Sequence, residues 1–265
     1  MLSMSGTQDA ARTALAEGDK FTFSNLTPPA NAAFNRLPEI QVAIRAATDS
    51  ARAAVAMAYT MNRLRKESDG KNIRGKFTPE AQDCLRSAVL FAGAGLDTAL
   101  KRLAAETLSG LVQTDVNVAR KLAEFAEDRI SDSSGSVSPK ELVRLLLGTG
   151  ASPRDTMVQR WIYDLESASA QSAPRVEEIA AALGVTNSAI RARIKPTKGR
   201  TSPLEQAFVA RNEIAHELDV TKPKEAARVK LEDIRRYRSV DSVIGHCVEL
   251  LDVTQVVTND VVSRL

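Results

Sequence analysis

Apolar residues recur every three or four positions along most of the chain, the spacing that places them on one face of an α-helix. The clearest case is residues 37–66, where one stripe contains Ile40, Ile44, Ala47 and Ala51. No segment of useful length shows the every-second-residue alternation of a β-strand, and no internal repeat is present. The pattern predicts an all-α fold, a helical bundle with long central and C-terminal helices and an extra N-terminal helix.

Hydroxyl residues followed by proline mark several of the expected helix starts, because the hydroxyl caps free amides and proline suits the first turn. Thr78 and Pro79 open the most apolar segment, which we expect to run to about residue 112 at the centre of the bundle. Combined with the apolar spacing, these signals predict helices over residues 37–66, 79–112, 116–130, 139–147 and 177–183, and helices that begin near residues 153, 203 and 240.

Changes in composition suggest three units along the chain. Residues 1–35 are polar and are expected to form a flexible or irregular arm. Residues 36–78 hold the N-terminal helix and a charged loop with two glycines. Residues 79–265 form the main helical domain in this interpretation.

The composition agrees with helices and adds a charge asymmetry. Hydrophobic residues make up 43% of the chain and aromatic residues only 4%, which favours helices packed through aliphatic side chains. The formal net charge of +3 is too small to indicate a nucleic-acid partner. Residues 190–240, however, contain 13 Lys and Arg against 7 Asp and Glu, which concentrates positive potential there.

The sequence gives no indication of a metal, a cofactor or a membrane segment. Cys84 and Cys247 are far apart and lack metal-ligand spacing, so we expect buried thiols in a reducing compartment. The longest uncharged apolar runs are ten residues, about half of the roughly 20 that span a bilayer. With no signal peptide recognisable, the expected location is cytoplasmic, without membrane contact.

Residues 211–216 have the sequence Arg-Asn-Glu-Ile-Ala-His, the strongest chemical signal in the chain. Arg211 is a permanent forked phosphate ligand, and His216 is suited to proton transfer near neutral pH. On one helix, Arg211 and His216 point about 140° apart, whereas Asn212 and His216 share a face. A two-fold dimer would bring two such sets together and supply one histidine as base and another as acid.

Arg211, Asn212 and His216 resemble the signature of the HEPN family: an arginine, a following polar residue and a histidine four to six positions later. The apolar residues 85–91, followed by Leu96 and Asp97, resemble the first core helix of its RiboL-PSP-type branch. The likeness covers roughly residues 79–265, although only the Arg–His motif is specific. Residues 37–66 are not explained by it.

The resemblance implies a homodimeric, metal-independent endoribonuclease, of the kind found as toxins paired with antitoxins or as effectors of phage defence. His216 would take the proton of a ribose 2′-OH, Arg211 would stabilise the charged phosphorane, and Asn212 would orient a phosphate oxygen or the imidazole. The products would be a 2′,3′-cyclic phosphate and a 5′-hydroxyl. DNA, which lacks the 2′-OH, would not be cut. An antitoxin or regulatory protein is a further expected partner.

A basic stretch just before the motif is the candidate RNA-binding rim. It would follow the phosphates of bound RNA without reading their sequence. A solvated loop is an equal alternative. Its residues are Arg191, Arg193, Lys195, Lys198 and Arg200.

Two other functions remain open on the sequence alone. Residues 176–194 resemble a helix-turn-helix with a glycine turn, a cap at Thr186 and a basic second helix, which is typical of a DNA-binding regulator. A non-catalytic HEPN-like module that binds nucleotides or a protein is the other alternative. In that case Arg211 would pair with an acid such as Glu205 or Asp219, and His216 would only end a helix.

Four residues outside the motif are expected to have mainly structural roles. Gly93 and Gly95 lie inside an apolar helical run and are expected to allow close helix packing. Asp97 is expected either to hydrogen-bond the motif or to pair with Lys101 on the same helix. His246 is expected to be a partly buried helix residue rather than a zinc ligand.

Overall fold

The computed structural model describes residues 37–68, 76–131, 138–147, 150, 152–195, 200–225 and 230–265. In these ranges the regular elements are helical, apart from one isolated bridge between Val220 and Arg235, which confirms the all-α class. The proposed arm, residues 1–35, lies outside the described residues. The elements are α2 (Pro38–Ser68), α3 (Pro79–Thr114), α4 (Val116–Ser131), α5 (Pro139–Leu147), α6 (Pro153–Ser167), α7 (Ala173–Ala182), α8 (Ser188–Ile194), α9 (Pro203–Glu217), the 3₁₀ turn η2 (Pro223–Glu225), α10 (Leu231–Ile234) and α11 (Val240–Val262).

Three of the predicted caps form as expected. The side chains of Thr78, Ser152 and Ser202 accept backbone N–H groups at the starts of α3, α6 and α9. Helix α7 begins at Ala173, where the side chain of Ser172 caps it and Pro174 lies in its first turn. The short α10 was not predicted, since four residues are too few to show a helical period.

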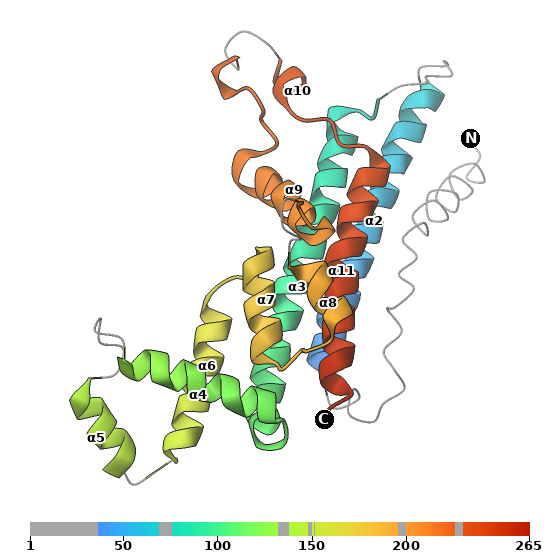
Figure 1. Cartoon of the computed structure of the whole chain (residues 1–265). Helices are drawn as coiled ribbons and strands as arrows, with labels where there is room; N and C mark the ends of the chain where they lie inside the picture. The colour runs from blue at the N-terminus through green and yellow to red at the C-terminus, as the bar shows by residue number, and fades with distance from the viewer. Residues whose placement is uncertain are drawn as a thin grey trace.

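Helix α3 is the central element, and the long helices α2 and α11 run beside it (Figure 1). The chain direction of α2 is opposite to that of α3 and α11 (Figure 1). Helix α9 packs against both α3 and α11, while α4 to α6 lie to one side of the bundle. Buried side chains occur on several faces of α3, which is the behaviour expected of a helix enclosed by neighbours.

The close contact between α2 and α3 depends on Gly95. A Cβ atom at this position would lie 2.2 Å from the Cβ of Ala47 on α2, far inside van der Waals contact. The expected packing role of Gly95 is therefore confirmed. Gly110, further along the same helix, has no atoms within 4 Å of the corresponding position.

We predict that Gly95→Ala destabilises the protein, because the added methyl group has to push α2 away from α3. Overpacking of this kind costs about 1–3 kcal/mol. Gly110→Ala is the matched control in the same helix, and it should be neutral or stabilising by up to about 1 kcal/mol because alanine is the better helix former. Urea unfolding followed by circular dichroism measures both. Equal midpoints for the two variants would contradict the prediction.

Candidate functional site

Helix α9 carries the Arg–Asn–His motif and presents two different faces. Its buried stripe includes Leu204, Ala207 and Ile214, and these side chains face α3 and α11. Arg211 follows Ala207 by four residues and precedes Ile214 by three, so it belongs to the same stripe. The guanidinium therefore leaves the helix from the side that packs against the bundle.

The side chain of Arg211 lies across α3 at Gly93. A Cβ atom at Gly93 would be 3.2 Å from Cγ of Arg211 and 3.7 Å from its Nε. Nη1 of Arg211 donates to Oδ1 of Asn212 at 3.0 Å, while the buried Nε has no hydrogen-bond partner among the described residues. Burial lowers the pKa of Arg211, and the nearby charge of Asp97 acts in the opposite direction.

The alternative pairing of Arg211 with Glu205 or Asp219 is wrong. Within the described residues the hydrogen bonds of Asp219 go to other arginines, and Arg211 bonds only to Asn212. The structure confirms the expected salt bridge of Asp97 with Lys101, at 3.3 Å. Oδ1 of Asp97 accepts from the backbone N–H of Ala170 and from the hydroxyl of Ser169, which ties α3 to the segment before α7.

His216 lies in the last turn of α9 and is exposed. Its side chain makes no hydrogen bond or ion pair with the described part of the chain. Asn212 and the exposed apolar side chain of Val209 lie on the same face, four and seven residues earlier. Within one chain, a hydrogen bond thus holds Asn212 beside Arg211. The side chain of His216 leaves the helix on a different side from that of Arg211.

Helix α9 ends in a tight reversal built from two non-glycine residues with positive φ. Leu218 has φ 51° and Asp219 has φ 60°, a conformation that costs free energy in L-residues. The reversal turns the carboxylate of Asp219 back into the bundle, where it is buried. It accepts from Nε of Arg86 on α3 at 2.9 Å and from Nε and Nη2 of Arg238 at 2.8 and 2.6 Å.

Asp219, Arg86 and Arg238 form an ion cluster at the end of α9. Glu213, which follows Asn212 in the sequence, belongs to the same cluster. Oε2 of Glu213 accepts from Arg236 at 2.8 Å and from Arg238 at 2.9 Å. Gln82 on α3 exchanges two further hydrogen bonds with the backbone of Arg238. Because Glu213 and the end of α9 are both fixed in this way, the rotation of α9 about its axis is set, and with it the directions of the motif side chains.

His246 on α11 is half-buried, as expected, and its Nε2 lies 3.2 Å from the hydroxyl of Ser242. Burial lowers the pKa of His246. The charge of Arg238 lowers it further, and that of Glu213 opposes them. His246 is therefore close to the ion cluster that supports α9, although no sequence pattern connects it with the motif.

Two of the predicted RNA-binding residues are ion-paired with acids of neighbouring helices. Arg191 and Arg200 are exposed. Arg193 is ion-paired with Glu249 and Asp252 of α11, and Lys195 pairs with Glu177 of α7. Lys198 lies outside the described residues.

Helices α7 and α8 form the pair of helices expected for a helix-turn-helix. Gly184 in the turn has φ 73°, and a Cβ atom there would come within 2.7 Å of Val118 on α4. The predicted cap at Thr186 is wrong: α8 begins one residue later, because Oδ1 of Asn187 accepts from the N–H of Ala189 at 3.0 Å. Ser188 and Arg191 are exposed on α8, whereas Arg193 is held against α11.

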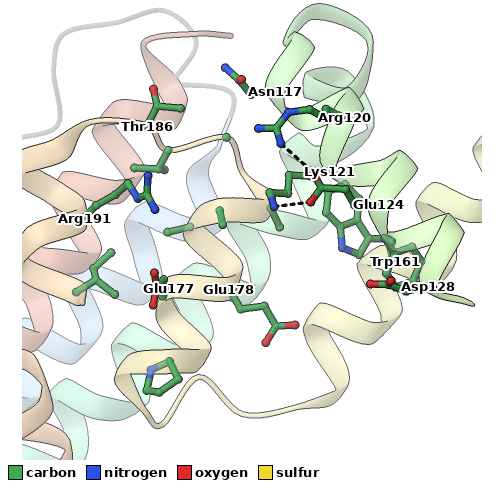
Figure 2. A pocket seen from close by; sticks show the side chains of 18 residues that line it. Asn117, Arg120, Lys121, Glu124, Asp128, Trp161, Glu177, Glu178, Thr186 and Arg191 are labelled. Carbon is green, nitrogen blue, oxygen red and sulfur yellow. Dashed lines mark hydrogen bonds and ion pairs between the residues drawn. The ribbon is translucent and has the colours of Figure 1, made fainter. Parts of the chain in front are cut away.

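A cavity of about 620 Å³ opens between α4, α6, α7 and α8, and it does not include the motif (Figure 2). Its size is typical of small-molecule sites. Its charges are nearly balanced, however, with acids exceeding bases by one, so it has no attraction for a polyanion. The charged residues of the lining are Arg120, Lys121, Glu124, Asp128, Glu177, Glu178 and Arg191.

The thiols of Cys84 and Cys247 are free, and burial raises the pKa of both. In the described ranges, no group of three or more His, Cys, Asp and Glu side chains is arranged to hold a metal ion. None of the helices in those ranges is both long and apolar enough to cross a membrane.

Comparison of the chain with protein-family models, with curated proteins and with solved structures finds no match. The functional interpretation therefore rests on the residues of the motif and on their geometry.

We predict that Asp219→Ala costs about 3–5 kcal/mol of stability, because it leaves Arg86 and Arg238 buried without their shared carboxylate. Glu124→Ala is the control, since the ion pairs of this residue lie at the surface of α4 and contribute little to stability. Urea unfolding at neutral pH separates the two. Similar losses in both variants would show that the buried cluster contributes no more than a surface pair.

The same carboxylate gives stability a predicted pH dependence. Burial raises the pKa of Asp219, but the hydrogen bonds from Arg238 and Arg86 outweigh this, and its pKa is lowered in the folded protein. The stabilisation is therefore complete above the unfolded pKa of about 3.9 and is lost as pH falls through the lower folded value. In that acidic window, the urea midpoint of Asp219→Asn should change less with pH than the midpoint of the wild type does.

Proposed function

We propose that this chain is a metal-independent endoribonuclease of the HEPN type, with Arg211, Asn212 and His216 as its active residues. The observation that carries the proposal is that Arg211 is partly buried without an acidic partner in the described part of the chain. Its guanidinium is partly desolvated, yet no carboxylate pairs with it among the described residues. A purely structural arginine on a buried stripe would be expected to have such a partner, whereas an oxyanion ligand needs its donors free.

The chemistry assigned to the three residues follows from their surroundings. His216 is exposed and free to take the proton of a ribose 2′-OH, which then attacks the adjacent phosphorus. Arg211 stabilises the charge that develops on the phosphorane, and its hydrogen bond keeps Asn212 beside it. The leaving 5′-oxygen takes a proton, and the other product is a 2′,3′-cyclic phosphate.

The proposal includes a two-fold homodimer, because one chain does not direct Arg211 and His216 to the same point. Their side chains leave α9 about 140° apart. A second copy would contribute the other set and supply the second histidine. Val209, exposed on the face of α9 that carries Asn212 and His216, offers apolar contact area for such a partner. As a HEPN-type enzyme the protein would act as a toxin or a phage-defence effector controlled by an antitoxin or regulatory protein.

We predict that the purified full chain cleaves single-stranded RNA in EDTA and leaves DNA intact. His216→Ala should lower the cleavage rate by about 10²–10⁴, the usual value of a proton-transfer group. Arg211→Ala should lower it by about 10²–10³, because one charge-stabilising group is lost. Gel analysis of end-labelled RNA measures the rates, and chemical mapping of the 3′ end identifies the cyclic phosphate.

His246→Ala is the control, because this residue is the other histidine of the chain and points to the support of α9 rather than to its exposed face. The variant should fold and retain cleavage. The mass in solution tests for the dimer. A folded dimeric wild type that cuts no RNA, or a cleavage activity that survives His216→Ala, would reject the proposed function.

DNA binding through α8 is a second candidate, favoured by the left-handed turn at Gly184 between α7 and α8 and by the exposed Ser188 and Arg191. Salt-dependent binding of duplex DNA that is lost in Arg191→Ala would support it. Arg193 is unsuitable for this test, because its pairing with Glu249 and Asp252 joins α8 to α11.

A further inference from the structure

Three glycines of α3 meet three different surroundings. Gly95 faces Ala47 of α2, and Gly110 faces open space. Gly93 faces the side chain of Arg211, whose Cγ, Nε and Cδ are the three heavy atoms nearest to a Cβ at this position, at 3.2, 3.7 and 3.9 Å. Gly93 is itself buried. The helix packing expected for this glycine is thus a contact with one functional side chain rather than with another backbone.

The need for a glycine here follows from the position of Arg211 on α9. A long cationic side chain on a buried stripe has to pass over the neighbouring helix before its charged end reaches water. Any side chain at position 93 would occupy the path taken by Cγ and Cδ. At Gly93 the missing side chain leaves this space to Arg211, whereas at Gly110 it leaves open space.

The charge of α3 favours the same path. Asp97 follows Gly93 by four residues and lies on the same face of the helix. Its carboxylate is held by Ala170, Ser169 and Lys101, so it attracts the guanidinium of Arg211 without bonding to it. Within the described residues the only hydrogen bond of the Arg211 side chain is the one to Asn212.

We infer that Gly93 is a positioning residue, and that the slot it leaves on α3 fixes where the guanidinium of Arg211 stands in the active site. Its use in catalysis rests on the proposed ribonuclease function. The steric relation between Gly93 and Arg211 does not, and it is tested separately.

The first test is a comparison of melting temperatures. Gly93→Ala and Gly110→Ala are each made in the wild type and in Arg211→Ala. When Arg211 is truncated, the slot is empty and Gly93→Ala should raise the melting temperature as Gly110→Ala does, by about 2–4 °C. When Arg211 is present, the gain from Gly93→Ala should vanish or reverse, while the gain from Gly110→Ala is unchanged. Equal effects of Gly93→Ala in the two backgrounds would overturn the inference.

The second test is kinetic and uses the full-length chain with single-stranded RNA. Gly93→Ala should lower kcat by about tenfold with little change in KM, because a displaced guanidinium no longer meets the transition state. The pH profile should keep its shape, since His216 is untouched. A KM effect without a kcat effect, or an equal loss in Gly110→Ala, would overturn the catalytic role. A wild type without cleavage would reject the ribonuclease proposal, and the melting comparison would still decide the steric one.

Discussion

The placement of the motif helix α9 depends on the hydrogen bonds that the carboxylate of Asp219 accepts from two arginines. This carboxylate comes from a reversal that two residues adopt at positive φ, and it brings together Arg86 of the central helix and Arg238 of the segment before α11. Paired buried charges of this kind add little net stability compared with apolar packing, but they are costly to break. Their effect here is geometric. Glu213 joins the same cluster, so ion pairs hold α9 both at Glu213 and at its C-terminal end.

That fixed rotation explains why the two chemical groups of the motif behave differently. Arg211 falls on the buried stripe and leaves the helix over α3 through the space at Gly93. His216, five residues later, falls on the outer side and reaches solvent. A single copy of the chain therefore does not direct Arg211 and His216 to the same point. The dimer in the proposed function is a consequence of this geometry as much as of the family resemblance.

The fold was largely predictable because its signals are local. The caps at Thr78, Ser152 and Ser202 and the period of the apolar residues depend only on neighbouring residues, and the structure has those helices. The support of the site could not be predicted, since it joins Gln82 and Arg86 to residues more than 130 positions away. The sequence marked Asp219 only as a nearby acid for Arg211. Its actual partners depend on the packing of α3 against the end of α9, which no local pattern encodes.

Much of the positive charge between residues 190 and 240 is paired with acids in the folded protein. Arg193 and Arg235 pair with acids outside that segment, and Arg236 and Arg238 pair with Glu213 inside it. These guanidinium groups connect helices, and a charge already neutralised within 3 Å contributes little to the field at a distance. Long-range attraction of RNA by this segment is therefore weaker than the sequence suggests. Under the proposed function, recognition of the scissile phosphate then falls mainly on Arg211, with which no carboxylate pairs among the described residues.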